Sequence, residues 1–283
     1  MLFRSKAATL PVAAFGVGIG VDDGIYLWSV MARYLEQGQP LHYAYVQALR
    51  NTGRAVVFTS LSLIVAVGAL HRAFGLEEMV VASYQAASGA GQAGIDTLYA
   101  QLDKVSGTRS LGQRAGDVRS AVGGDLGPFP APLAMNVVPW AGSLKADGWS
   151  SEELKIRNES RKILGLPALK VAATCVRVPV VTTHSVAVHA TFSGPVSREQ
   201  AWEVLRMAPG VVVADDPETG EFPTPVDVVG TDPSWVGRIR QSLDDPRTIE
   251  LFVCGDNLRK GAALNTAQIA ELVAAELGSR PLR

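Results

Sequence analysis

The sequence predicts apolar helices over its first 70 residues and an α+β or α/β domain over the rest of its 283 residues. Residues 7–21 and 55–70 contain no charged side chain, whereas beyond residue 70 charges are regularly spaced and turns with Gly, Pro and Asp recur. In this second part, segments of period two alternate with segments of helical period. We therefore expect two regions, 1–70 and 71–283, of which the second is a folded domain.

The composition excludes several classes of partner. The net charge of −1 gives no electrostatic reason to expect nucleic acid. Cys175 and Cys254 are the only cysteines, and they are 79 residues apart without neighbouring Cys/His pairs. A disulfide framework and a zinc site are therefore not expected. No metal is predicted, and a cytoplasmic location is expected for residues 71–283.

The first region has long uncharged, apolar runs that are typical of membrane proteins. Its two uncharged runs are shorter than the roughly 20 residues that a helix needs to cross a bilayer. The first run continues past Asp22 and Asp23, so that residues 6–33 are long enough to cross. Carboxylates inside a membrane helix are candidates for a functional site such as a proton relay, and the alternative is an exposed helical fragment. The sequence therefore allows membrane association through residues 7–70.

The second region contains clear signals for helices and strands. Ser150 with Glu153, and Ser197 with Gln200, are capping boxes that predict helix starts. The segment 184–192 alternates cleanly between apolar and polar residues, as a half-buried strand does. Residues 71–79 are predicted to end a helix and connect to a strand, and residues 105–125 to form a surface loop. The predicted helices are 7–32, 36–50, 94–105, 151–164, 198–207 and 262–277, and the run 55–70 begins another apolar helix that stops short. The predicted strands are 80–86, 171–178, 184–192, 211–214 and 249–254.

The stretch VVASYQAASGAG at residues 80–91 suggests a buried site. An apolar run leads to Gln85, and a Ser-Gly-Ala-Gly turn follows. This pattern predicts a strand that delivers a polar side chain to a Gly-rich loop. No nucleophile lies nearby in the sequence that Gln85 would assist.

Arg177 and His184 are the second candidate pair. They flank Pro179 and Thr182-Thr183, which break the strand and allow a turn to bring both side chains to one site. Arg can hold a carboxylate through two parallel hydrogen bonds, and His can act as an acid or base near neutral pH. The alternative, a surface Arg and a structural His, is favoured by residue type alone.

Two charged segments are weaker candidates. Lys155, Glu159 and Lys162 share one face of the helix EELKIRNESRKILG, either as the wall of a site for an anionic substrate or as a solvated face. Arg259 and Lys260 precede the last predicted helix, where an anion site and an ordinary capped helix start are both compatible with the sequence.

Seven stretches of residues 71–283 carry a family resemblance. They are VVASYQAASGAG, MNVVPWAG, EELKIRNESRKILG, ATCVRVPVVTTHS, APGVVVADDP, FPTPVDVVGTDPSWVGRIRQ and DNLRKGAALNTAQIAE. In order and spacing they closely resemble aspartate-semialdehyde dehydrogenases. The resemblance implies a substrate and dimerisation domain, which is a mixed sheet flanked by helices similar to the catalytic domain of glyceraldehyde-3-phosphate dehydrogenase. It also implies NADP as cofactor, aspartyl phosphate or aspartate semialdehyde as substrate, and a dimer.

The resemblance also implies roles for individual residues. Gln85 matches the active-site Gln that orients the substrate, and His184 matches the acid/base His. Arg177 matches the residue that binds the substrate carboxylate. Glu159 matches the residue that holds the substrate amino group, and Lys162 the Lys on the phosphate side.

Cofactor contacts follow from the same resemblance, but two family features are missing. Ser88 and Gly89 match the loop near the nicotinamide, and Asn257 matches its C-terminal contact. The catalytic Cys of the family would fall at or before the apolar run that ends in Leu70, where the sequence has no Cys. The family's Gly-rich nucleotide loop is absent, and Cys175 matches a structural cysteine. The resemblance therefore implies a chain that lacks the nucleophile and the Rossmann domain and is inactive alone.

Residues 1–70 resemble a different family. The stretches VGIGVDDGIYLWSV and TGRAVVFTSL resemble a resistance-nodulation-division superfamily exporter and cover one transmembrane helix, a connector and the start of the next helix. Several interpretations stay open. The chain is a shortened enzyme, a module that dimerises with itself or with an intact homologue, a membrane fragment with a soluble passenger, or two gene fragments joined by an artefact.

Overall fold

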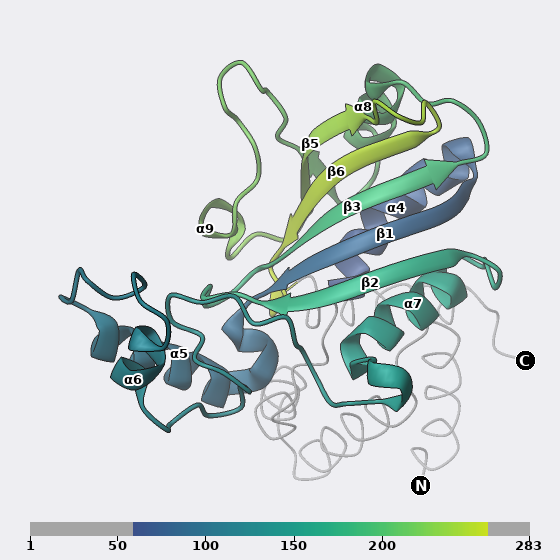
Figure 1. Cartoon of the computed structure of the whole chain (residues 1–283). Coiled ribbons are helices and arrows are strands. Elements are labelled where there is room, and N and C mark those ends of the chain that lie inside the picture. The colour runs from purple at the N-terminus through teal and green to yellow at the C-terminus, as the bar shows by residue number, and fades with distance from the viewer. Residues whose placement is uncertain (1–58, 260–283) are drawn as a thin grey trace, which may run out of the picture.

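The computed structural model describes residues 59–259, which form a six-stranded mixed sheet with helices on one side of it (Figure 1). The strand order is β2-β1-β3-β6-β5-β4. The pairs β1/β2 and β4/β5 are parallel, and the other neighbours are antiparallel. The strands are β1 Leu76–Gln85, β2 Lys170–Arg177, β3 His184–Phe192, β4 Val211–Val213, β5 Ser234–Gln241 and β6 Thr248–Gly255. The expected mixed sheet flanked by helices is confirmed.

Three helices cover one face of the sheet. The helix α4 crosses behind β1, β3, β6 and β5, while α7 packs on β2, and α8 packs on β4 and β5 (Figure 1). Of the described helices, only the short α9 contacts the sheet elsewhere, at β6. The helices are α4 Thr59–Phe74, α5 Gly91–Val105, α6 Asp117–Val122, α7 Ser151–Ile163, α8 Arg198–Arg206 and α9 Pro225–Val228, with 3-10 turns η1 Ala87–Ala90 and η2 Ala146–Gly148.

The junction of α4 and β1 differs from the sequence prediction. The segment 71–79 is not a connector, because α4 continues to Phe74 and β1 begins at Leu76. Gly75 alone joins them with a φ of +70°, a conformation that Gly adopts without a steric cost. The acidic pair at 77–78 and a β-bulge between Leu76 and Glu78 hide the period-two pattern in the sequence.

The apolar helix α4 belongs to the core of this domain. Leu63, Val67 and Leu70 are at most 1 % exposed and pack with Met79 and Phe192 of the sheet. The predicted boundary after residue 70 thus falls inside a helix that the sheet domain buries. Residues 1–58, which contain most of the exporter-like sequence, lie outside the described part of the chain.

Membrane association through residues 7–70 finds no support in the described part of the chain. Across residues 59–259, no helix has both the length and the apolar character that crossing a bilayer requires. The apolar side chains of α4 are instead explained by burial against the sheet.

Most of the other predicted elements are confirmed within one to three residues. The strand 184–192 matches β3, and its predicted face is buried. Both capping boxes form at the starts of α7 and α8. The prediction missed β5, because Gly237 and a β-bulge after it interrupt the alternation. It also missed α6 inside the predicted loop 105–125, and the predicted helices 7–32, 36–50 and 262–277 lie outside the described residues.

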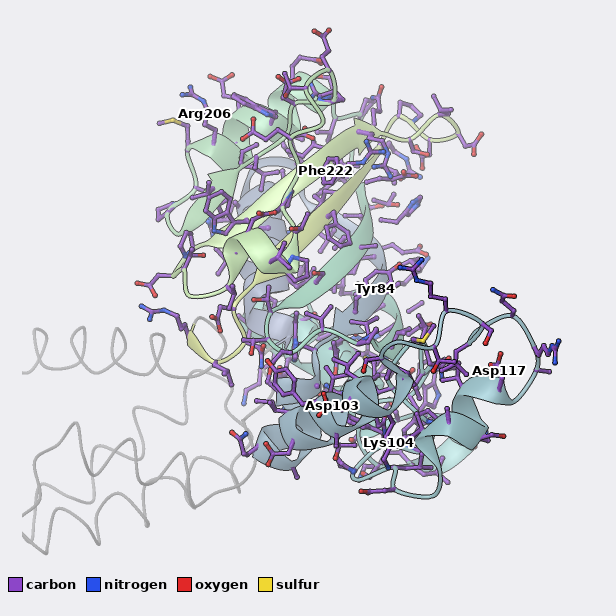
Figure 2. All side chains as sticks on the ribbon, turned by 90° about the vertical axis from the view of Figure 1, so that its left-hand side faces the viewer. Tyr84, Asp103, Lys104, Asp117, Arg206 and Phe222 are labelled. Atoms are coloured by element: carbon purple, nitrogen blue, oxygen red, sulfur yellow. The ribbon has the colours of Figure 1, made fainter. Side chains whose placement is uncertain are left out.

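Residues between β1 and α7 form a separate helical lobe with its own apolar clusters. Figure 2 shows this lobe, which carries Lys104 and Asp117, at the opposite end of the molecule from Arg206. The buried Gln101 side chain forms hydrogen bonds that connect three backbone groups within the lobe. Its Oε1 accepts hydrogen bonds from the backbone N–H groups of Leu133 and Ala134, and its Nε2 donates to Asp125 O.

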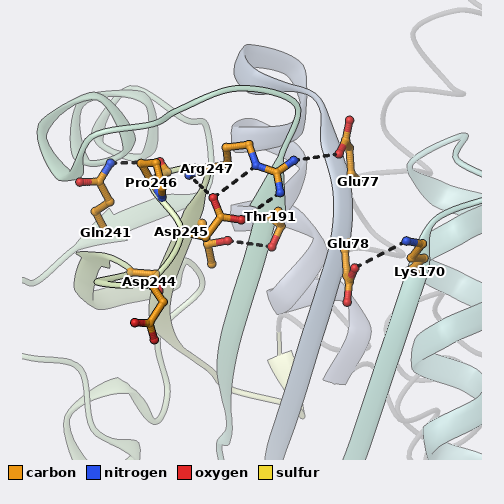
Figure 3. Close-up of polar contacts among 11 residues, drawn as sticks. Glu77, Glu78, Lys170, Thr191, Gln241, Asp244, Asp245, Pro246 and Arg247 are labelled. Atoms are coloured by element: carbon orange, nitrogen blue, oxygen red, sulfur yellow. Dashed lines mark hydrogen bonds and ion pairs between the residues drawn. The ribbon is translucent and has the colours of Figure 1, made fainter.

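Surface polar contacts join the strands at the other end of the sheet. Arg247 forms ion pairs with Asp245 and Glu77, at 3.0 and 3.6 Å, and the Thr191 and Thr248 hydroxyls are 2.8 Å apart (Figure 3). Exposed ion pairs of this kind contribute roughly 0–1 kcal/mol each. The cluster fits a structural role, and the candidate site lies at the opposite end of these strands.

Candidate functional site

The sheet brings distant parts of the sequence together at one edge. Gln85 and Arg177 end the parallel strands β1 and β2 and lie in register with each other. His184 begins β3 beside them, in register with Gly255 at the end of β6. All three side chains are at most 5 % exposed. The predicted group of Gln85, Arg177 and His184 therefore shares one buried site.

The backbone of Ala86 links the side chains of Arg177 and His184. Its N–H donates a hydrogen bond to His184 Nδ1 at 3.1 Å, and its carbonyl oxygen accepts one from Arg177 Nη1 at 2.7 Å. One peptide segment directly after β1 thereby fixes both side chains. No side-chain pattern in the sequence could indicate this role, because it is carried by the backbone.

The hydrogen bond to Nδ1 assigns the tautomer of His184. Because Nδ1 accepts, the proton of the neutral imidazole is on Nε2. Burial, together with the neighbouring charge of Arg177, lowers the pKa of His184 to about 3. The ring is thus a neutral hydrogen-bond donor at neutral pH, with Nε2–H facing the site.

Arg177 supplies a buried positive charge to the same site. Burial lowers its pKa, and the nearby Glu152 carboxylate opposes this effect. Loss of its proton would still need a pH far above the physiological range. A guanidinium has five N–H donors in a planar fork, so a bond to Ala86 leaves donors that can hold a carboxylate.

Gly89 brings the main chain against both of these groups. A Cβ atom at this position would lie 2.5 Å from Arg177 Nη1 and 3.1 Å from His184 Nε2. No other residue type fits here without displacing these groups. The Gly-rich turn in the sequence predicted a close approach of this kind, although not its partners.

Several buried polar atoms of the site have no hydrogen-bond partner. They are Gln85 Oε1, His184 Nε2 and Thr183 Oγ1, whereas Gln85 Nε2 donates to Ser83 Oγ at 3.2 Å. Most buried polar atoms in native proteins are hydrogen-bonded. Three such atoms at the same edge of the sheet therefore indicate a place for a polar ligand.

The residues expected to contact NADP are turned toward one another. Asn257 Nδ2 donates to Ser88 Oγ at 3.0 Å, and both side chains are at most 4 % exposed. Asn257 Oδ1 also accepts the backbone N–H of Thr183. Both side chains thus have hydrogen-bond partners within the protein. The roles of Ser88, Gly89 and Asn257 as contacts near the nicotinamide stay predictions.

Neither cysteine has the properties of a nucleophile. Cys175 lies in register with Ser83, next to the site, and burial raises its pKa to about 12. Burial also raises the pKa of Cys254 to about 11, and its sulfur lies 3.1 Å from Ser185 Oγ. Both remain protonated thiols near neutral pH, whereas attack requires the thiolate.

The two charged helix candidates lie on α7. On α7, Glu159 is half-buried, while Lys162 is exposed. Glu152, two turns of α7 nearer the helix start, is a carboxylate whose charge favours the protonated form of Arg177. The site roles of Glu159 and Lys162 stay predictions.

Two further histidines and Arg259 make contacts away from this site. His71 Nδ1 accepts the N–H of Leu76 at the α4–β1 junction, and His189 lies 3.6 Å from the Glu250 carboxylate on the sheet surface. Arg259 pairs with Asp232 at 2.7 Å, and Asp256 accepts the backbone N–H of Arg259. Lys260 and the helix predicted after it lie outside the described residues, so the anion site and the capped helix start both stay predictions. No grouping of three His, Cys, Asp or Glu side chains suited to a metal occurs in the described residues.

Comparison with known proteins agrees with the fold. Residues 67–260 match the family model of the semialdehyde dehydrogenase dimerisation domain. The chain is 50 % identical over 219 residues to an aspartate-semialdehyde dehydrogenase of Corynebacterium melassecola, which covers 76 % of this chain and 61 % of that protein. The chain thus spans less than two thirds of the length of the curated relatives it matches.

Solved structures give the same result. The fold superposes on aspartate semialdehyde dehydrogenase II of Vibrio cholerae complexed with ASA, at a TM-score of 0.69 and 34 % identity, covering 77 % of this chain and 61 % of that one. The enzyme of Candida albicans, solved with NADP, matches at 22 % identity and a TM-score of 0.50, covering 76 % and 55 %. The chain belongs to the semialdehyde dehydrogenase family, of which it carries the dimerisation domain.

Proposed function

We propose that these 283 residues bind aspartate semialdehyde, as an aspartate-semialdehyde dehydrogenase does, but do not turn it over by themselves. The observation that carries this proposal is the buried Arg177 guanidinium beside His184, whose Nε2–H has no hydrogen-bond partner. Arg177 binds the carboxylate of aspartate semialdehyde, and His184 donates a hydrogen bond to its aldehyde or hydrated aldehyde oxygen.

The two thiols limit this proposal to binding. Acyl transfer in the family's reaction needs a thiolate that forms a covalent intermediate. Cys175 and Cys254 are the only cysteines, and their pKa values of about 12 and about 11 keep them protonated. NADP enters the proposed reaction through the family likeness alone, and no step of the proposed binding involves it.

Binding and turnover can be measured on the same preparation. We expect calorimetry to show binding of aspartate semialdehyde. Arg177→Lys should weaken this binding by about tenfold or more, because a lysine ammonium cannot hold a carboxylate through two parallel hydrogen bonds as a guanidinium does. Arg247→Lys, an exposed Arg at the other end of the sheet, is the matched control and should bind as the parent does. No reduction of NADP above the blank is expected in the presence of phosphate; measurable turnover, or equal binding by both variants, would overturn the proposal.

We also propose that the domain forms a homodimer through the uncovered face of the sheet. Val80 and Tyr84 are 45 % and 37 % exposed there, and the ring centroids of Tyr84 and Phe252 are 6.0 Å apart. Apolar and aromatic side chains on an uncovered face are typical of an interface between subunits. An intact homologue with the same face is the alternative partner, and the finding that would favour it is co-purification with a full-length dehydrogenase.

A further inference from the structure

The residue before His184 is held in a strained conformation. Thr183 has a φ of +84°, although it is β-branched and side chains of this type are rarely found in that region. It is fully buried, and its hydroxyl has no hydrogen-bond partner. Backbone strain of this kind persists only where surrounding contacts enforce it, and it concentrates at functional sites.

The contact that enforces this conformation comes from the other end of the sequence. Asn257 Oδ1 accepts the backbone N–H of Thr183 at 2.9 Å. The same carboxamide exchanges hydrogen bonds with the Ser88 hydroxyl, at 3.0 and 3.2 Å. Asn257 thus joins the loop after β1, the residue before β3 and the end of β6, and all three side chains are at most 4 % exposed.

Backbone hydrogen bonds continue this connection to the site. Ala87 N donates to Val180 O at 2.7 Å, and Ser88 N donates to Val181 O at 2.9 Å. The loop that carries Ala86 is therefore fixed to the segment that leads into Thr183. The turn at Thr183 then directs the chain into β3, where the His184 ring meets the N–H of Ala86.

We propose that Asn257 is a positioning residue for His184: it holds the left-handed turn at Thr183 and so keeps the imidazole on Ala86 with its proton on Nε2. The Asn carboxamide is suited to this task because one oxygen can accept two hydrogen bonds while the nitrogen donates a third. This role differs from the cofactor contact that the sequence resemblance implies for Asn257. It rests on the proposed function only in that the site of His184 is the one proposed to bind substrate.

The proposal predicts a change in the imidazole of His184 that can be measured without any ligand. Long-range proton–nitrogen spectra of the full chain distinguish the two neutral tautomers and the charged ring for its four histidines. His184→Gln identifies the His184 signals. In the parent we expect the Nε2–H form alone, with no titration down to about pH 4. In Asn257→Ala we expect a mixture of tautomers and a titration midpoint shifted toward the ordinary value of about 6.5.

Gln101→Ala is the matched control. Gln101 is also a carboxamide, 1 % exposed, with three hydrogen bonds to backbone groups, but all of its partners lie in the helical lobe. The substitution should lower stability without altering the His184 signals. If Gln101→Ala changes these signals as Asn257→Ala does, the effect is general loosening and the proposal is wrong.

A second variant tests the path through Thr183. Glycine adopts a positive φ without strain, so Thr183→Gly should restore the parent spectrum when it is combined with Asn257→Ala. The double variant should also fold if Asn257→Ala alone does not. An unchanged spectrum in Asn257→Ala, a double variant that stays altered, or a double variant that does not fold would each overturn the proposal. Because no ligand is present, failure of substrate binding leaves these results unaffected.

Discussion

At the scale of single residues, Gly89 is the most sterically restricted position of the site. We expect Gly89→Ala to abolish binding of aspartate semialdehyde while the domain stays folded, because the added Cβ would occupy the space 2.5 Å from Arg177 Nη1. Calorimetry measures the binding, and circular dichroism the fold. Gly194→Ala is the control, since nothing lies within 4 Å of its Cβ and its φ is ordinary. Unchanged affinity in Gly89→Ala would contradict the assignment of the site.

His184 should also make stability depend on pH. An unfolded chain protonates this residue below about pH 6.5, whereas the folded chain does so only near pH 3. Between these values the unfolded state binds more protons, so the free energy of unfolding decreases as the pH falls. The slope is up to about 1.4 kcal/mol per pH unit.

The comparison with His184→Gln isolates this contribution. The variant is neutral at every pH, so we expect its urea midpoint to fall less between pH 7 and pH 4.5 than the midpoint of the parent does. All other titrating groups are common to both chains and cancel in the difference. Parallel curves would mean that His184 takes up its proton in the folded state at an ordinary pKa.

At the scale of elements, α4 is the helix whose packing partner cannot be predicted from the sequence. Its apolar run resembles part of an exporter, yet Leu63 and Leu70 are 0 % exposed in the core of the sheet domain. The capping boxes of α7 and α8 follow the opposite pattern, because the sequence specifies them locally and they form as expected. Local signals therefore placed the helix starts, but only tertiary contacts show what an apolar helix packs against.

Truncating Leu70 tests whether α4 is part of the domain. We expect Leu70→Ala to lower the free energy of unfolding by about 2–5 kcal/mol, because a fully buried leucine is replaced by a cavity. Urea denaturation followed by the fluorescence of the tryptophans measures this loss. Leu243→Ala, at a fully exposed leucine, is the control and should change stability by less than about 0.5 kcal/mol. A neutral Leu70→Ala would mean that α4 does not stabilise the sheet.

At the scale of the whole molecule, the sheet has one face covered by helices and one face that the described helices leave largely open (Figure 1). Rows of apolar side chains on the open face, with Trp235 half-buried among them, need a cover in water. In the proposed symmetric dimer, a second copy of the same face supplies this cover. The covered face, by contrast, is filled by α4, α7 and α8.

Sedimentation can test this interface with one charge substitution. We expect the parent to sediment as a dimer, and Tyr84→Lys to shift the chain toward monomer, because an unpaired charge would be buried at the centre of the interface. Met207→Lys is the control, since Met207 is 70 % exposed at the end of α8, on the covered side of the sheet. A monodisperse monomer in the parent would refute the dimer, and loss of the dimer in both variants would refute this surface.

Local sequence signals correctly predicted most helices and strands of the second region that the structure describes. Alternation placed β3, and capping residues placed α7 and α8, since these signals depend only on neighbours in the chain. The order and spacing of the motifs that contain Gln85, Arg177 and His184 identified the family. Where the pattern is interrupted, as at the acidic pair before Met79 and at Gly237, the sequence did not show that a strand continues.

Only the tertiary structure decided how the site is held together. The backbone of Ala86, the strained turn at Thr183 and the Asn257 carboxamide join segments up to 169 residues apart, and no local pattern encodes such contacts. The pKa of His184 and of the two thiols depends on burial, which arises when the strands and helices assemble. Residue types and their spacing thus determined which groups the chain offers, while packing decided their protonation, their partners and the role of each.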